Sequence, residues 1–222
     1  MAFILDGTTG IATVDGSVSA PSQRGQDSNS GISYAADTIK FSTNGVERMA
    51  ITNSGVTGTG LGGGKILQVV QAVKTDVSST SNEAFSDVGS LSVNITPSNS
   101  NNKILVHWHG TYSSNSNRTG HIRLQREFSG SANNDTLYVG DAGTANQPRV
   151  TNSMTVSNQY FAESFTGTFL DSPSTTNQIT YKLRFAAGDQ GYTIYIGRMM
   201  DNNNEYSRSR QPASITVMEV AA

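Results

Sequence analysis

Two histidines lie two residues apart in the run KILVHWH, as His107 and His109 on either side of Trp108. Alternate side chains of a β-strand point to the same face, so both imidazoles would share one face, with Val106 and Trp108 on the other. Such a pair can chelate a metal ion, but a complete site needs further ligands, and the sequence shows none that converge. We therefore expect Val106 and Trp108 in the core, interpret the histidines as packing or surface residues, and predict no metal or other cofactor.

Pairs of carboxylates are the second possible source of chemistry, because two of them roughly 5 to 9 Å apart can hydrolyse a glycosidic bond. The candidates are Glu83, Asp87, Glu127, Asp135, Asp141, Glu163, Asp171, Asp189, Asp201, Glu205 and Glu219. Most stand beside turn residues, where Asp commonly forms local hydrogen bonds, and the sequence does not indicate which would meet. Motifs of serine hydrolases, phosphate-binding loops, zinc proteases and dinucleotide-binding folds are absent. The sequence therefore predicts a protein that is not an enzyme.

Arginine and tyrosine residues near predicted turns are better suited to binding, since they combine apolar area with polar groups at low entropic cost. The candidates for contact with a partner are Tyr112, Arg118, Tyr206, Arg208 and Arg210. Three predicted loops together combine Asn and Ser side chains with Arg118, Tyr206, Arg208 and Arg210; they are 113–120, 129–135 and 201–210. We expect any recognition surface to be built from these loops.

The composition is polar without being charged: 35% of the 222 residues are hydrophobic, 14% are charged, and the formal net charge is −2. Self-repulsion therefore gives the chain no reason to stay unfolded. The lack of Lys and Arg clusters argues against a nucleic-acid partner. The absence of cysteine excludes disulfides and thiolate metal sites. Neither a basic leader nor an apolar stretch of ~20 residues is present, so we expect synthesis in the cytoplasm and no membrane insertion.

Residues 65–222 contain nine runs that alternate between apolar and polar residues or are wholly apolar, as expected of strands. They are 65–74, 91–96, 103–109, 121–128, 137–139, 160–170, 179–185, 192–196 and 214–220. Turn-forming residues separate them at the spacing of an antiparallel sandwich, and helical periodicity is nearly absent. We therefore predict an all-β fold in which these residues form an antiparallel, jelly-roll-like β-sandwich head.

Residues 1–64 hold few bulky apolar side chains and many glycines, which is too little for a globular core of their own. Two interpretations follow from composition: a flexible tail, or a thin β-rich segment that is ordered by oligomerisation. The three glycines 62–64 resist both helix and strand and mark the boundary between two packing units. The predicted domains are therefore 1–64 and 65–222.

Residues 37–55 read DTIKFSTNGVERMAITNSG, two short alternating strands around an Asn-Gly pair, which is a strong signal for a tight hairpin turn. Ile39 and Phe41 share one face before the turn, and Met49 and Ile51 share one face after it. One thin hairpin cannot bury this apolar stripe, whereas a threefold arrangement supplies two more faces. These four residues are the predicted trimer contacts.

This stretch resembles a segment that recurs in bacteriophage tail-fibre and related virion proteins, a Glu-Arg-Met element followed by a Gly-rich exit. The run GGGKILQVVQAVKTDVSST, from Gly62, is similar to the start of a β-rich domain in marine and cyanobacterial phage structural proteins. The resemblance implies intertwined homotrimeric shafts, in which the stripe of each chain packs on its partners. His-x-His elements in such fibres hold iron on the threefold axis, and whether His107 and His109 do so stays open. Ala50 stands where these segments often have a basic residue.

These features predict a virion protein, most simply a homotrimeric tail fibre or receptor-binding protein that adheres to the host. Residues 1–64 would form the attachment and shaft segment that contacts other virion proteins, and the head would bind a host surface polysaccharide or protein. One alternative is a capsid decoration protein, or head fibre. The other is a glycan-cleaving tailspike, disfavoured because the 222 residues hold no repeated coils for the long β-helix that such enzymes commonly use.

Overall fold

The computed structural model describes residues 15–58, 65–115, 117–129, 134–144 and 146–222. Over these residues sixteen strands form three antiparallel sheets, and none of the described residues is helical. The predicted all-β fold class is therefore confirmed. The chain divides into two compact units, Met1–Lys65 and Ile66–Ala222, one residue beyond the boundary expected from the glycines at 62–64.

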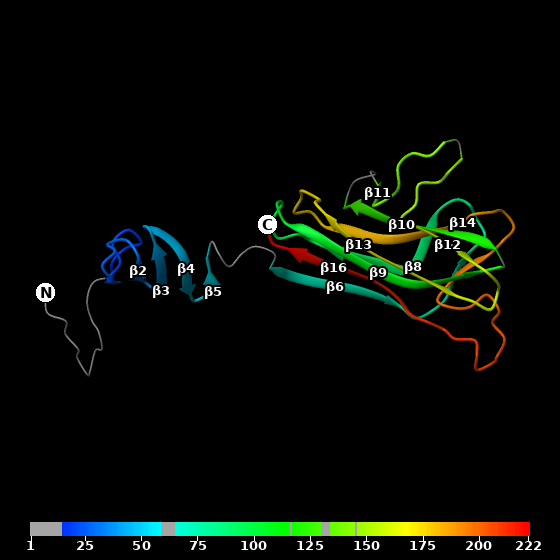
Figure 1. The fold of residues 1–222 in the computed structure, drawn as a ribbon, viewed down its shortest axis with the longest axis horizontal. Coiled ribbons are helices and arrows are strands. Elements are labelled where there is room, and N and C mark those ends of the chain that lie inside the picture. Colours follow the sequence, from blue (N-terminus) through cyan, green and yellow to red (C-terminus); the bar gives the residue numbers. More distant parts are fainter. Residues whose placement is uncertain (1–14, 59–64, 116, 130–133, 145) are drawn as a thin grey trace. The chain divides into compact units, whose positions relative to one another are not determined.

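Unit 1 is a meander of five short strands, each hydrogen-bonded to the next (Figure 1). They are β1 (Gln23–Arg24), β2 (Gly31–Ala35), β3 (Thr38–Thr43), β4 (Val46–Thr52) and β5 (Gly55–Thr57). The turn between β3 and β4 holds Asn44 at φ 52° and Gly45 at φ 70°. Two successive left-handed residues are what a tight two-residue hairpin turn requires, so the Asn-Gly hairpin forms as the sequence predicts.

Unit 2 is a sandwich of two antiparallel sheets, which we name after a central strand of each (Figure 1). The β9 sheet has the order β6-β16-β9-β15-β7, with β13 also paired to β9, and the β10 sheet has the order β11-β10-β14-β8, with β12 also paired to β10. The strands are β6 (Ile66–Lys74), β7 (Ser78–Thr80), β8 (Ser86–Ile95), β9 (Lys103–Ser114), β10 (Arg118–Phe128), β11 (Asn134–Leu137), β12 (Asn152–Val156), β13 (Glu163–Asp171), β14 (Ile179–Ala187), β15 (Ile194–Ile196) and β16 (Ala213–Val220).

The core lies between the two sheets and is filled from alternate positions of the central strands. On β9, Val106 and Trp108 are fully buried, as the alternation predicts, and they share one apolar cluster with Leu124 of β10 and Leu183 of β14. The indole Nε1 of Trp108 donates a hydrogen bond to Asn152 Oδ1 at 3.1 Å. The indole N–H therefore has a hydrogen-bond acceptor, and the rest of the ring is removed from water.

Glycines make room for the largest aromatic rings of this core. Gly167 on β13 is the cross-strand partner of Trp108, and a Cβ at Gly167 would lie 2.1 Å from the indole. Gly110 and Phe165 form a similar cross-strand pair, where a Cβ at Gly110 would lie 2.5 Å from the ring. Carbon atoms in contact are about 3.5 to 4.0 Å apart, so each ring occupies the space where a side chain would otherwise stand.

Some strand boundaries differ from the expected ones. The sequence predicts a strand over 160–170, but β13 begins at Glu163, and Tyr160 and Phe161 belong to the preceding loop. The amide of Tyr160 bonds to the side-chain oxygen of Asn158 at 2.9 Å, a local turn that competes with strand pairing. Strands β7 and β12 escape prediction because their Ser- and Thr-rich sequences carry little apolar alternation.

The connections of unit 2 gather at the two opposite ends of the sandwich. β6 begins and β16 finishes at one end, where Val220 pairs with both Ile66 and Lys103. At the other end, Gly120 near the start of β10 lies opposite Ala187 at the end of β14. The connections β9–β10, β12–β13, β14–β15 and β15–β16 are all made at this second end, which we call the loop end (Figure 1).

Candidate recognition surface at the loop end of unit 2

Two long connections lie against each other at the loop end: the one between β12 and β13, and the one between β15 and β16. The backbone N–H of Asp201 donates to the carbonyl oxygen of Gln159 at 3.2 Å and ties the two together. At the base of the second connection, Arg198 and Arg210 form an isolated β-bridge. Backbone bonds therefore define the course of both segments.

Arg208 fixes the second connection from within. Its Nε donates to Asp201 Oδ2 at 2.8 Å, and its guanidinium carbon lies 4.8 Å from the centre of the Tyr160 ring. The side chains of Arg208 and Asp201 are only 17% and 13% exposed, so this ion pair is largely withdrawn from water. A charge-assisted hydrogen bond in such a place holds its partners firmly. The guanidinium of Arg208, a predicted binding residue, is therefore already engaged in holding the loop in place.

Three aromatic rings remain exposed around this ion pair. Tyr160 and Phe161 are 48% and 51% exposed, and Tyr206 projects fully into solvent. Aromatic residues are enriched where proteins bind partners, because they offer large, rigid contact areas at low entropic cost. Tyr206 was selected from the sequence, whereas Phe161 was missed because the alternation around it indicates a strand.

Arg118 belongs to a second cluster at the loop end. Its Nη2 donates to the Tyr192 hydroxyl at 2.7 Å, its guanidinium carbon lies 3.6 Å from the centre of the Tyr192 ring, and its Nη1 is 3.5 Å from Asp189 Oδ2. The Arg118 side chain is 34% exposed. Arg210 is exposed and donates from Nη2 to Asn202 Oδ1 at 3.2 Å. Both predicted binding residues therefore reach the surface at this end.

Tyr112 corrects the sequence prediction, because it is fully buried and cannot contact a partner. Its hydroxyl donates to the carbonyl oxygen of Arg118 at 2.8 Å, and a Cβ at Gly120 would lie 2.1 Å from its ring. Burial raises the pKa of Tyr112 to about 12. The residue stands on β9 at the parity of Val106 and Trp108, so the alternation itself carried the signal that it points inward.

The three predicted binding loops do not lie together. Residues 113–120 belong largely to β9 and β10, and Ser113 is fully buried. Residues 129–135 follow β10 at the end opposite the loop end, with 130–133 outside the described residues. The 201–210 loop is at the loop end and is mostly exposed. The structure thus places two of the predicted loops, 113–120 and 201–210, at the loop end and 129–135 at the opposite end, and it adds the loop between β12 and β13 as a candidate.

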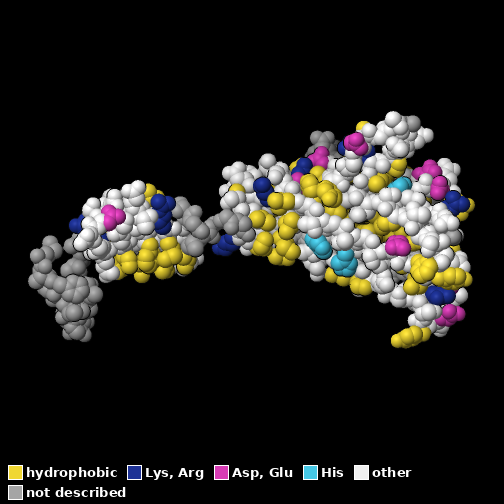
Figure 2. Space-filling model, in the orientation of Figure 1, with side chains coloured by type: hydrophobic (Ala, Val, Ile, Leu, Met, Phe, Trp, Pro, Cys, Tyr) yellow, Lys and Arg dark blue, Asp and Glu magenta, His cyan; other side chains and the backbone are white. Residues whose placement is uncertain are grey.

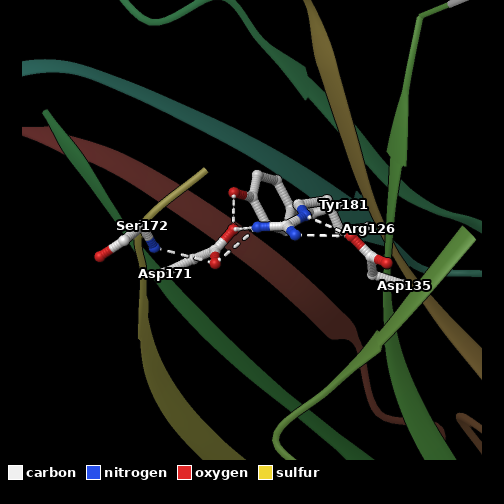
Figure 3. Close-up of polar contacts among 5 residues, drawn as sticks. All are labelled: Arg126, Asp135, Asp171, Ser172 and Tyr181. Carbon is white, nitrogen blue, oxygen red and sulfur yellow. Dashed lines mark hydrogen bonds and ion pairs between the residues drawn. The ribbon is translucent and has the colours of Figure 1, made fainter. Parts of the chain in front are cut away.

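Two of the candidate carboxylates, Asp135 and Asp171, lie on either side of Arg126 (Figure 3). Arg126 Nη1 donates to both oxygens of Asp171 at 2.8 and 2.7 Å, and Nη2 donates to Asp135 Oδ2 at 2.5 Å. The Tyr181 hydroxyl and the Ser172 amide also donate to Asp171, at 2.6 and 2.9 Å. Burial, together with the neighbouring Asp171, raises the pKa of Tyr181. These carboxylates are engaged in contacts that join the two sheets, so they are poorly placed to act as a glycosidase pair.

The outer face of the β9 sheet carries His107, which is half-buried, and His109, which is exposed. The side chains directly across from them on β13 and β16 are hydroxyls of Thr and Ser. Over the residues that the structure describes, no group of three or more His, Asp or Glu side chains could hold a metal ion. The same residues include no helix long and apolar enough to cross a membrane.

Comparison with known proteins gives no family. No protein-family model and no curated protein matches the chain. Three solved structures of infectious bursal disease virus match partially: the Gt strain (TM-score 0.38, 10% identity), the Gx strain (0.33, 13%) and the VP2 subviral particle (0.31, 11%). The matches cover 94%, 71% and 70% of this chain, but only 56%, 37% and 37% of those longer chains.

Proposed function

We propose that this chain is a structural protein of a virion, a fibre subunit that trimerises through unit 1 and attaches the particle to a host through the loop end of unit 2. The observation that carries the proposal is the one-sided sheet of unit 1. The resemblance of residues 37–55 to phage tail-fibre segments supports the same assignment. Residues 1–64 would also contact other virion proteins. Within this segment, 1–14 and 59–64 lie outside the described residues.

Two rows of large apolar side chains cross unit 1, and both rows point to the same face of its sheet. One row holds Ile32, Phe41 and Met49, and the next holds Tyr34, Ile39, Ile51 and Val56. Ile39, Ile51 and Val56 are 37%, 39% and 53% exposed. Figure 2 shows the resulting continuous hydrophobic band on unit 1. We call this the apolar face; it includes the four predicted trimer contacts.

The opposite face of the same sheet is already closed. Ser33, Ser42 and Ala50 are 1%, 4% and 3% exposed, and an ion pair of 3.1 Å joins Lys40 to Glu47 beside them. The sheet therefore has small and charged residues on one side and large apolar residues on the other. A five-stranded sheet with an uncovered apolar side gains stability when another surface buries it.

Copies of this chain are the natural cover for the apolar face. Each copy presents the same stripe, and three stripes arranged around an axis can cover one another, which is the arrangement that the resemblance to homotrimeric shafts implies. A trimer also carries three copies of the attachment site, so each single site can bind weakly. If three loop ends can engage one surface together, the apparent affinity rises by a factor on the order of 10² to 10⁴.

Molar mass in solution tests the assembly. The chain is 23.6 kDa, so light scattering should give three times this value, about 71 kDa. Ile51→Asp puts a charge in the middle of the apolar face and should give a monomer with an unchanged circular dichroism spectrum. Asn53→Asp adds the same charge in an exposed turn two residues away and should remain trimeric. A monomeric wild type, or a trimer that tolerates Ile51→Asp, would contradict the proposal.

Binding to host cells or their purified surface polysaccharide tests the attachment. Tyr206→Ala and Phe161→Ala should each weaken binding of the trimer, while Tyr138→Ala, which removes an exposed ring away from the loop end, should not. Release of reducing sugar would instead identify a glycan-cleaving enzyme. Failure of the wild type to bind, with the protein found on the capsid shell of the particle, would favour a decoration protein.

A further inference from the structure

The two outer faces of the unit 2 sandwich differ sharply in charge. On the β10 sheet, Lys182 forms ion pairs with Asp87 at 3.1 Å and Glu127 at 2.6 Å, and Arg184 pairs with Asp87 at 3.0 Å. These residues cross β8, β14 and β10 as a ladder of alternating charges. A surface of this kind is well hydrated, and it loses favourable interactions with water if another protein covers it.

The β9 sheet has a different outer face, built from three rows of four side chains across β6, β16, β9 and β13. We call it the uncharged face, and its rows are Val69, Met218, Leu105 and Leu170; Gln71, Thr216, His107 and Thr168; and Val73, Ser214, His109 and Thr166. None of these twelve residues is Lys, Arg, Asp or Glu. Burial of this surface would therefore desolvate no formal charge.

The first of these rows is apolar from one edge of the sheet to the other. Val69 at one edge is 57% exposed, Leu170 at the other is 46% exposed, and Leu67 and Val73 on β6 are 41% and 54% exposed. Figure 2 shows two histidine side chains close to a hydrophobic patch on this face. Among the residues that the structure describes, no segment covers the face.

We infer that the uncharged face is the surface through which unit 2 contacts a second copy of itself in the assembled fibre. The inference rests on the proposed trimer, because assembly through unit 1 brings copies of unit 2 together. Eight residues, 58–65, join β5 to β6, so each unit 2 is tethered closely to its own unit 1. Short tethers of this kind give effective concentrations of about millimolar, and the partner at that concentration is another copy of the same face.

The size of the face agrees with a contact that depends on the tether. Strands are about 4.8 Å apart and residues two positions apart along a strand are about 6.7 Å apart, so four strands and three rows cover roughly 400 Å². A stable interface between independent proteins buries about 800 Å² on each partner. The uncharged face is about half that size. It should hold neighbouring heads together within an assembled trimer and should fail to associate separate monomers.

Cross-linking of single cysteines tests the contact in the full chain, because the natural sequence has no cysteine. Thr168→Cys places a thiol within the uncharged face, and Ser92→Cys places one on the exposed outer face of the β10 sheet as the matched control. With a short bismaleimide, Thr168→Cys should form covalent dimers and trimers at least about tenfold faster than Ser92→Cys, given the local concentration in a trimer.

The outcomes separate this inference from the proposed trimer. If the wild type is a trimer but Thr168→Cys cross-links no faster than Ser92→Cys, the inference is wrong and the trimer stands. If the chain is monomeric, the proposed assembly through unit 1 fails first, and the tethered contact fails with it. Adding Ile51→Asp to Thr168→Cys should abolish cross-linking at micromolar concentration. Cross-linking that persists in this variant would overturn the dependence on the tether.

Discussion

Replacing Gly167 by alanine would place a methyl group 2.1 Å from the indole of Trp108, well inside contact distance. Trp108 cannot move away easily, because it is fully buried and its Nε1 is bonded to Asn152. Gly167 is also not one of the glycines with positive φ, so alanine brings no backbone strain and the whole effect is steric. Overpacking of this kind destabilises a protein by about 1 to 3 kcal/mol.

The assay is denaturant unfolding followed by tryptophan fluorescence, since Trp108 is the single tryptophan of the chain and reports on the core of unit 2. Gly140→Ala is the control, because a Cβ at Gly140 would meet no atom within 4 Å. Its free energy of unfolding should stay within about 0.5 kcal/mol of the wild type. Trp108→Phe, followed by circular dichroism, should be less costly in the Gly167→Ala background than in the wild type, because the smaller ring leaves room for the methyl group. Equal stability of Gly167→Ala and Gly140→Ala would refute this account of the packing.

Three further substitutions probe the core and its buried polar groups. Trp108→Ala should lower the free energy of unfolding by about 3 to 5 kcal/mol through the cavity it leaves, and an unchanged melting temperature would show that the assignment of inward-facing residues on β9 is wrong. Arg126→Met should cost about 3 to 5 kcal/mol near pH 7, because it leaves Asp171 buried without its cation; urea unfolding at that pH measures this. Burial raises the pKa of Glu219, but hydrogen bonds from Gln68, Asn102 and Ser98 outweigh burial and lower it to about 2. The folded state thus binds a proton at Glu219 more weakly than the unfolded chain does. The ionised carboxylate therefore adds at most about 3 kcal/mol to the free energy of unfolding above pH ~4.5, and this contribution should be lost as the pH falls toward 2. Glu219→Gln should remove this dependence, so its free energy of unfolding should change less with pH over that interval.

Period-two alternation explains most of what the sequence could predict. On β3 and β4 it placed Ile39, Phe41, Met49 and Ile51 on one face, and the register of the strands brings them into two adjacent rows. The alternation on β9 likewise placed Val106 and Trp108 inside. Such patterns are local, because the pleat of a strand alone decides which side chains share a face.

Other features of the fold depend on contacts between distant parts of the chain, which the sequence does not indicate. Asp171 and Arg126 are 45 residues apart and meet only because β13 and β10 belong to facing sheets. Tyr160 and Phe161 have the composition of a strand, but no neighbouring strand pairs with them, and they remain in a loop. Pairing partners are set by topology, which alternation within one segment does not encode.

The loop end separates residues that hold the surface in place from residues that are free to touch a partner. Arg208 bonds to Asp201 and lies over Tyr160, so Arg208→Ala would disturb the loop as well as remove a surface group. A loss of binding in that variant would not identify a contact. Tyr206 projects fully into solvent, and its removal should leave stability unchanged within about 0.5 kcal/mol. A loss of host binding in Tyr206→Ala at unchanged stability would therefore place the partner directly on this surface.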